Sequence, residues 1–330
     1  LGMKLDVFSM FSGYPNRDLA STTLGKPLSS QFQNQSLSLA ERWKLFEPLW
    51  QRGRNTGFVT MSEIALRDLF GVEELTAGNV EEISARIAAS NTKGVTERLL
   101  RDRSRHKFIV LEDRQPEPEM PVSDLFVIAR RFDRYVLATT RFELDEIAKS
   151  TGVSIQTFAD LETALEKDFE KWLKKTRLAA VKTTLAYHRS LHFRKVTREE
   201  AGRDFEKVAQ NSSLPPPPNR PGGDNPYDRF TNLPTRNLQD YLFRRVVGLV
   251  KEHKLPMQIH TGKQIGNNVV ENSNPMHLTN IFFDFPDVEF DLFHSSWPYL
   301  REAIAQAKTF ANVHLDMTWM HILSPAAARQ

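Results

Sequence analysis

Two stretches decide the fold, Pro256-Met-Gln-Ile-His260-Thr-Gly262 and Val288-Glu-Phe-Asp-Leu-Phe-His294-Ser-Ser-Trp-Pro298. Each is a short apolar run that ends on a histidine and is followed at once by small or turn-forming residues. About thirty residues of helix-like sequence separate them, which is typical of consecutive parallel strands joined by a helix. We therefore expect His260 and His294 at the carboxyl ends of adjacent strands, where α/β barrels place their chemistry.

The same alternation extends along most of the chain. We expect strands at residues 107–112, 134–139, 178–184, 257–260, 289–294 and 312–316. Helices are expected at 124–131, 143–150, 161–175, 197–210, 238–253, 274–285 and 298–310. This alternation predicts a parallel sheet with helices packed outside it. Because no G-x-G-x-x-G turn follows any of these strands, a dinucleotide-binding sheet is disfavoured and most of a barrel is the better description.

Residues 1–105 are interpreted as a loop and a helical insertion, or lid, that precedes residues 106–330, the two parts forming one domain overall. Residues 1–35 look irregular. Ser38-Leu-Ala-Glu41 is a capping box that starts a helix, and Thr60-Met-Ser-Glu63 predicts a second, short helix ending at Gly71. Further helices are expected at 80–89 and 95–103. The Pro-rich tract 215–234 is interpreted as a long loop over one mouth of the barrel, with a rigid linker as the alternative.

Composition narrows the possible functions. The 330 residues are 40% apolar and 26% charged, an ordinary globular balance. The net charge of +3 is carried by scattered basic residues, so a nucleic-acid partner is not expected, and no apolar run approaches the roughly 20 residues of a membrane span. We expect a small-molecule substrate and a cytoplasmic protein without a signal peptide, and we allow for a homo-oligomer. The absence of cysteine excludes thiolate sites, so a metal must be held by His, Asp, Glu or a modified Lys.

His260 and His294 are the first candidates for chemistry. Imidazole nitrogen suits Zn, Fe, Ni or Co, although a single histidine near an apolar run is more often structural. Lys182 lies near the end of the strand Val181-Lys-Thr-Thr184, where an ammonium group is costly to bury without a partner. It is interpreted as a strand-end lysine that reaches solvent, a carbamylated metal-bridging lysine, a clamp for a substrate carboxylate, or a general acid or base.

Residues near these three could bind the substrate. Tyr187 and Arg189 follow Lys182 in the adjoining loop, and Arg189 could bind a carboxylate with two parallel hydrogen bonds. Trp297 could form a wall of the site. His314 and Asp316 share a face of the last strand, so either side chain could face the site. Asp316 could instead cap the turn that follows.

Several of these stretches resemble a known family. They are Val181-Lys-Thr-Thr-Leu-Ala-Tyr-His-Arg189, Gln258-Ile-His-Thr-Gly262, Asn274-Pro-Met-His-Leu278, Leu292-Phe-His-Ser-Ser-Trp-Pro-Tyr299 and Asn312-Val-His-Leu-Asp316. Together they resemble the amidohydrolase superfamily, in particular its amidohydrolase-2 branch of metal-dependent TIM-barrel hydrolases. Residues 60–71 also look like the helical region of uronate isomerases. The resemblance covers about residues 60–320 and implies a (β/α)8 barrel.

Position by position, the resemblance implies that His260 is the site histidine of the fifth barrel strand and His294 that of the sixth. Lys182 falls on the fourth strand, and Asp316 ends the seventh. The family's first strand carries His-x-His, which this sequence lacks, and its eighth strand carries an aspartate that would lie beyond Gln330. We therefore expect the first and eighth strands to be missing from this chain, and the six expected strands to be the second to seventh.

These observations predict a metal-dependent hydrolase of a small, carboxylate-bearing substrate. His260, His294 and Lys182 are the expected metal ligands, and Lys182 and His294 the expected catalytic residues. Tyr187, Arg189 and Trp297 are expected to bind the substrate. Zinc is the preferred metal, with Mn, Fe and Ni as alternatives. A uronate-isomerase-like enzyme or a decarboxylase on the same scaffold is the second hypothesis, and an inactive barrel that acts as a binding or scaffold protein is the third.

Overall fold

The computed structural model describes residues 5–23, 31–113, 123–213, 235–264 and 269–330. The chain divides into two compact units, Leu1–His106 with Ile322–Pro325, and Lys107–His321 with Ala326–Gln330. The tract 215–234, predicted to be a long loop, lies outside the described residues. Among the described residues, no helix is long and apolar enough to cross a membrane.

The first unit is helical. Its elements are η1 Val7–Phe11, α1 Tyr14–Ser21, α2 Leu39–Gly53, α3 Gly57–Phe70, α4 Val80–Ser90, α5 Val95–Glu97 and the π-turn η3 Arg98–Arg103. α2 begins at the predicted capping box, because the Ser38 hydroxyl accepts the Glu41 N–H and the Glu41 carboxylate accepts the Ser38 N–H. Aromatic rings dominate the core, and Phe46 is in ring contact with Phe8, Phe11 and Phe32.

Two predictions for this unit are wrong. Residues 7–21 are helical rather than irregular, because the Asp6 carboxylate caps η1 and Pro15 occupies the first turn of α1, where its missing N–H costs nothing. Thr60-Met-Ser-Glu63 does not start a helix, since α3 already begins at Gly57. Glu63 instead accepts a hydrogen bond from the Trp50 indole N–H at 2.6 Å. The predicted end of this helix at Gly71, in the left-handed conformation, is confirmed.

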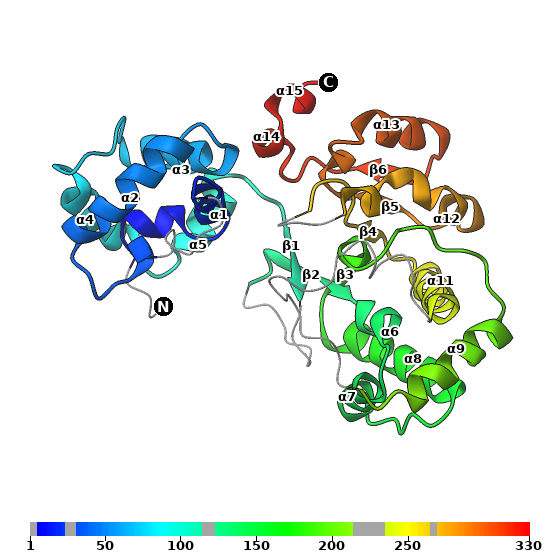
Figure 1. Ribbon diagram of the computed structural model, residues 1–330. Coiled ribbons are helices and arrows are strands. Elements are labelled where there is room, and N and C mark those ends of the chain that lie inside the picture. The colour runs from blue at the N-terminus through cyan, green and yellow to red at the C-terminus, as the bar shows by residue number, and fades with distance from the viewer. Residues whose placement is uncertain (1–4, 24–30, 114–122, 214–234, 265–268) are drawn as a thin grey trace. The chain divides into compact units, whose positions relative to one another are not determined.

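Six parallel strands form the sheet of the second unit, with each strand hydrogen-bonded to the next in chain order (Figure 1). They are β1 Ile109–Asp113, β2 Phe126–Arg131, β3 Leu178–Thr183, β4 Met257–Ile259, β5 Phe290–Leu292 and β6 Val313–Leu315. A doubly wound sheet reverses its strand order at one point, whereas a barrel does not. The uninterrupted order β1 to β6 therefore confirms the α/β class and the barrel-type succession of strands.

Helices and short turns connect these strands. The helices are α6 Asp133–Leu137, α7 Arg141–Thr151, α8 Phe158–Lys175, α9 Arg198–Gln210, α11 Arg236–Glu252, α12 Thr279–Asp284 and α13 Leu300–Thr309. The 3-10 turns are η4 Leu185–Tyr187, η5 Val270–Ser273, η6 Pro275–Leu278 and η7 Phe293–Ser296, and two short helices, α14 Met320–Leu323 and α15 Pro325–Ala328, follow β6.

The predictions for residues 124–139 are reversed in the structure. The expected helix at 124–131 is strand β2, and the expected strand at 134–139 contains helix α6. The β-branched Val127 and Ile128 suit the centre of a strand. Asp133 starts α6 and fixes it to β3, since its carboxylate accepts hydrogen bonds from the Thr183 hydroxyl and the Thr184 N–H, both at 2.7 Å.

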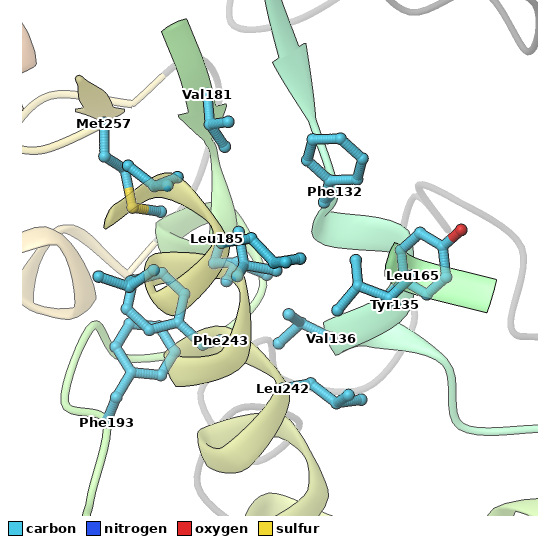
Figure 2. Packing of buried hydrophobic residues seen from close by; sticks show 14 of the residues in the cluster. Phe132, Tyr135, Val136, Leu165, Val181, Leu185, Phe193, Leu242, Phe243 and Met257 are labelled. Atoms are coloured by element: carbon cyan, nitrogen blue, oxygen red, sulfur yellow. The ribbon is translucent and has the colours of Figure 1, made fainter. Parts of the chain in front are cut away.

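The two faces of the sheet differ in chemistry. Val181, Met257, Phe290 and Val313 lie opposite one another in register and belong to the buried core that the helices cover. Figure 2 shows Val181 and Met257 in this core, together with residues of α11. Successive side chains of a strand point to opposite faces. The next residue of each strand therefore forms a polar row on the other face, Arg131, Lys182, Gln258, Asp291 and His314.

Candidate active site

His260 and His294 lie together at the carboxyl ends of two adjacent strands. His260 is the first residue after β4, and His294 lies in η7 directly after β5. Their ring centroids are 4.9 Å apart and the rings are nearly perpendicular, at 78°. Both side chains are buried, and the Nε2 atom of each has no hydrogen-bond partner among the described residues. Two adjacent buried nitrogens without partners are available to a ligand.

The chain after β6 fixes the orientation of His294. Nδ1 of His294 is 2.8 Å from the main-chain carbonyl oxygen of Thr318. A carbonyl oxygen can only accept, so Nδ1 carries the proton of the neutral ring and Nε2 presents a lone pair. The Trp319 ring stacks on the imidazole, with centroids 4.6 Å apart and planes at 6°. The Asp316 carboxylate accepts a hydrogen bond from the main-chain N–H of His294 at 2.9 Å, which fixes the backbone of His294.

Burial keeps both imidazoles in the form that binds metals. Burial, together with the nearby His294 and Lys182, lowers the pKa of His260 to about 3, while a backbone hydrogen bond with Lys263 acts in the opposite direction. Burial also lowers the pKa of His294, against a hydrogen bond with Thr318 and the charge of Asp316. Both rings are neutral at pH 7, and only neutral imidazole can donate a lone pair to a metal.

A close main-chain contact joins the loops that carry the two histidines. The Lys263 N–H donates to the Trp297 carbonyl oxygen at 2.5 Å. Gly262, with φ of +69°, permits this approach, because a Cβ atom there would lie 2.2 Å from the same oxygen. On the other loop, His294 and Ser295 have φ of 63° and 42°, a conformation that costs L-residues energy and that clusters at functional sites.

Lys182 lies on the polar face of β3 and is half-buried. Its Nζ is 3.3 Å from a Glu112 carboxylate oxygen and 3.6 Å from the centroid of the Phe293 ring. Burial lowers the pKa of Lys182, and Glu112 opposes that effect. The lysine is thus an ion-paired cation close to the chain segment that carries His294.

Of the three residues predicted to bind substrate, the structure brings Tyr187 to the histidine pair, with its ring 4.7 Å from that of His260. Trp297 follows His294 closely and contributes its carbonyl oxygen to the loop contact with Lys263. Arg189 lies elsewhere. Its buried guanidinium binds Asp240 at 2.5 Å and Gln239 at 3.0 Å. The predicted role of Arg189 in binding a substrate carboxylate finds no support in these contacts.

Sequence reasoning missed several residues around the site. Gln258 and Asp291 are neighbours in the polar row, with an amide-to-carboxylate distance of 3.1 Å, and burial together with Asp316 raises the pKa of Asp291 to about 6. The period of two in each strand could have placed these side chains on the face of Lys182. Thr318 and Trp319 carried no such signal, because they act through a carbonyl direction and a ring stack.

The residues fit a divalent metal in part. His260 and His294 supply two neutral imidazoles with bare Nε2 atoms. Among the described residues, however, no group of three or more His, Asp and Glu side chains could hold an ion. Catalytic zinc sites use three protein ligands and a water. The described part of the chain therefore has two side chains that could serve as ligands of such a centre.

Comparison with known proteins agrees with this geometry. Residues 216–330, which include both histidines, match the amidohydrolase family model. The amidohydrolase resemblance is confirmed. Within the second unit, the amidohydrolase match covers β4, β5 and β6 and the chain segments that follow them. A curated protein, fluG of Emericella nidulans, is 41% identical over 87 residues, which is 24% of this chain. The chain spans about a tenth of the length of that protein, since the match covers 10% of it.

Solved structures share the fold at low sequence identity. A uronate isomerase from Thermotoga maritima has a TM-score of 0.66 at 15% identity, covering 94% of this chain and 70% of that one. A uronate isomerase from Bacillus halodurans has a TM-score of 0.56 at 12% identity, covering 95% and 68%. A protein from Lactobacillus casei described as a metal-dependent hydrolase has a TM-score of 0.55 at 18% identity, covering 89% and 68%. These likenesses establish the fold of the chain and leave its substrate open.

Proposed function

We propose that this chain is part of a metal-dependent, amidohydrolase-like enzyme that hydrolyses a small, carboxylate-bearing substrate. One observation carries the proposal, the pair of buried Nε2 atoms of His260 and His294 that lack partners among the described residues. Leaving buried polar atoms unpaired costs folding free energy, and a divalent ion bound to them would remove that cost. Such an ion, zinc in the first place, supplies Lewis acidity and activates water at neutral pH.

Around the ion, the chain's own side chains have separate tasks in this proposal. Thr318 and Trp319 hold the His294 ring so that its Nε2 faces the ligand. Lys182 provides a positive charge beside Phe293 that could attract the substrate carboxylate or deliver a proton. Tyr187 packs beside His260 and could contact the substrate, and Trp297 could form a wall. The metal-bridging role of Lys182 stays a prediction, because its ammonium group pairs with Glu112.

Metal binding tests the proposal directly. The protein is stripped with a chelator and titrated with Zn²⁺ by calorimetry, and with Co²⁺ while its visible absorption is recorded. Changes beside a ligand already lower metal affinity by about 10–100-fold, so His260→Ala and His294→Ala should each lower it by about 100-fold or more. His277→Ala, which removes a half-buried histidine of η6 that is not one of the proposed ligands, is the matched control. Absence of binding to the wild-type protein, or wild-type affinity in both alanine variants, contradicts the proposal.

A uronate-isomerase-like activity is the second candidate. It is supported by the fold likeness to two uronate isomerases and by the helical first unit. Both candidates, like the decarboxylase alternative, involve a substrate carboxylate. The zinc-loaded protein is therefore incubated with one panel of amides and lactones and another of uronates, and products are identified by mass spectrometry and NMR. Turnover of uronates alone would replace hydrolysis with isomerisation.

A further inference from the structure

A cavity lies apart from the histidine pair, at the carboxyl ends of β2 and β3. Its volume is about 290 Å³. The lining residues are Arg130, Arg131, Asp133, Arg134, Leu137, Thr184 and His188. One water occupies about 30 Å³ of liquid, so the cavity has room for a small organic molecule or ion. None of the residues proposed above to hold the metal or contact the substrate lines it.

The lining is rich in positive charge. Three guanidinium groups face one carboxylate, that of Asp133. This carboxylate is already engaged, because it accepts hydrogen bonds from the Thr183 hydroxyl and from the N–H and hydroxyl of Thr184. Burial, moreover, raises the pKa of Asp133, against the hydrogen bonds from Thr184 and Thr183 and the charge of Arg131. The carboxylates that pair with Arg131 and Arg134 belong to Glu112 and Asp168, which do not line the cavity.

Arg131 and Arg134 are held in place by hydrogen bonds and ion pairs with their neighbours. Arg131 donates to the Thr184 hydroxyl at 2.6 Å and contacts Glu112 at 3.3 Å. Arg134 binds Asp168 through Nη2 at 2.7 Å. Its Nε is buried and has no hydrogen-bond partner among the described residues. A fixed guanidinium with an unused buried donor loses little entropy on binding an oxyanion and gains the missing hydrogen bond.

From this geometry we infer that the cavity binds the oxyanion group, a carboxylate or a phosphate, of a small molecule through Arg131 and Arg134. Guanidinium groups match both oxyanions in charge and shape. This site does not depend on a metal at His260. The occupant would nevertheless adjoin the candidate active site, because Thr184 and His188 flank η4, whose Tyr187 packs against the His260 ring.

Calorimetry on the metal-free protein tests the inference, with succinate and inorganic phosphate as separate probes. Leu137 lines the cavity and is half-buried, so Leu137→Glu and Leu137→Gln place groups of the same size there that differ by one charge. Leu137→Glu should bind the better probe about tenfold more weakly than Leu137→Gln, because the added carboxylate repels it. Equal affinities of the two variants, or no binding of either probe to the wild-type protein, would overturn the inference.

Arginine variants localise the contact. Arg131→Gln should weaken binding by about tenfold or more, the usual effect of losing a hydrogen bond to a charged group. Arg203→Gln, an exposed arginine on α9, should leave it unchanged. Tighter binding of succinate assigns the site to carboxylates, and tighter binding of phosphate assigns it to phosphate groups. His260→Ala should retain probe binding even if the protein binds no metal, so this inference and the proposed function can fail separately.

Discussion

Two buried polar clusters of the second unit have opposite hydrogen-bonding states. In one, Arg189 and Asp240 are at most 1% exposed, and the contacts of Asp240 extend to Arg194 at 2.8 Å. In the other, His260 and His294 are also buried, yet each presents a buried nitrogen without a partner among the described residues. The charged groups of the first cluster are paired within the chain, whereas the second leaves two nitrogens to which a ligand could bind, as proposed above. The comparison separates structural from functional polar groups where burial alone does not.

The largest expected effect comes from breaking the complete cluster. Asp240→Asn leaves the Arg189 guanidinium buried without its counter-charge, so the free energy of unfolding should fall by about 3–5 kcal/mol. Urea denaturation measures the change. Asp287→Asn, which removes an exposed partner of Lys251, should change stability by less than about 1 kcal/mol. A loss as small as that of the control in Asp240→Asn would mean that the cluster is not structural.

A smaller effect is expected where the incomplete cluster is supported. Trp319→Leu removes the ring that stacks on His294 but leaves the Thr318 carbonyl in place. We expect zinc affinity to fall about tenfold, the lower end of the range for residues that orient a ligand. Zinc titration measures it, with Phe283→Leu on the exposed surface as the control. Unchanged affinity would show that the Thr318 hydrogen bond alone orients the imidazole.

The smallest effect concerns Asp291. Its carboxylate has one partner among the described residues, the amide of Gln258, so its hydrogen bonding is intermediate between that of Asp240 and that of the two histidines. Burial raises the pKa of Asp291 from 3.8 to about 6. Between these two pH values the folded chain therefore keeps a proton on Asp291 that the unfolded chain has released. The stabilising contribution is therefore present in full below about pH 4 and is lost as pH rises through about 6.

Asp291→Asn should remove this pH dependence. At pH 8 the variant should be more stable than the wild-type protein by about 1–2 kcal/mol, after allowance for solvent screening of the partly exposed group. At pH 4 the two proteins should be equally stable. Urea denaturation at both values measures the difference, and a variant that is less stable at pH 8 would show that the charged carboxylate is favoured in the fold.

Local patterns in the sequence were sufficient where neighbouring residues determine the structure. The runs before His260 and His294 are short, apolar and followed by turn residues, and both form strands in the predicted places. β2 and α6 were interchanged because each is a short apolar run beside arginines, and periodicity cannot distinguish such runs. The carboxylate of Asp133 fixes α6, but its partner Thr183 lies 50 residues further along the chain.

Contacts between distant residues explain what the sequence left open in the site. The sequence around Arg189 gave no sign of its partner Asp240, which lies 51 residues away, where no local pattern connects them. The orientation of His294 depends on the main-chain carbonyl of Thr318, 24 residues further on. A carbonyl group belongs to every residue, so its direction leaves no mark in the amino-acid type.

The contact between Lys263 and the Trp297 carbonyl, made possible by Gly262, bears on the proposed binding of a ligand by the histidine pair. It joins the main chain after β4, next to Gly262, to the main chain after β5. The distance between the backbones that carry the two imidazoles is thereby limited, while the His294 ring is oriented separately by Thr318 and Trp319. If the pair binds a metal as proposed, the ion would meet two ligands whose loops are already joined, so little chain ordering would remain to oppose its binding.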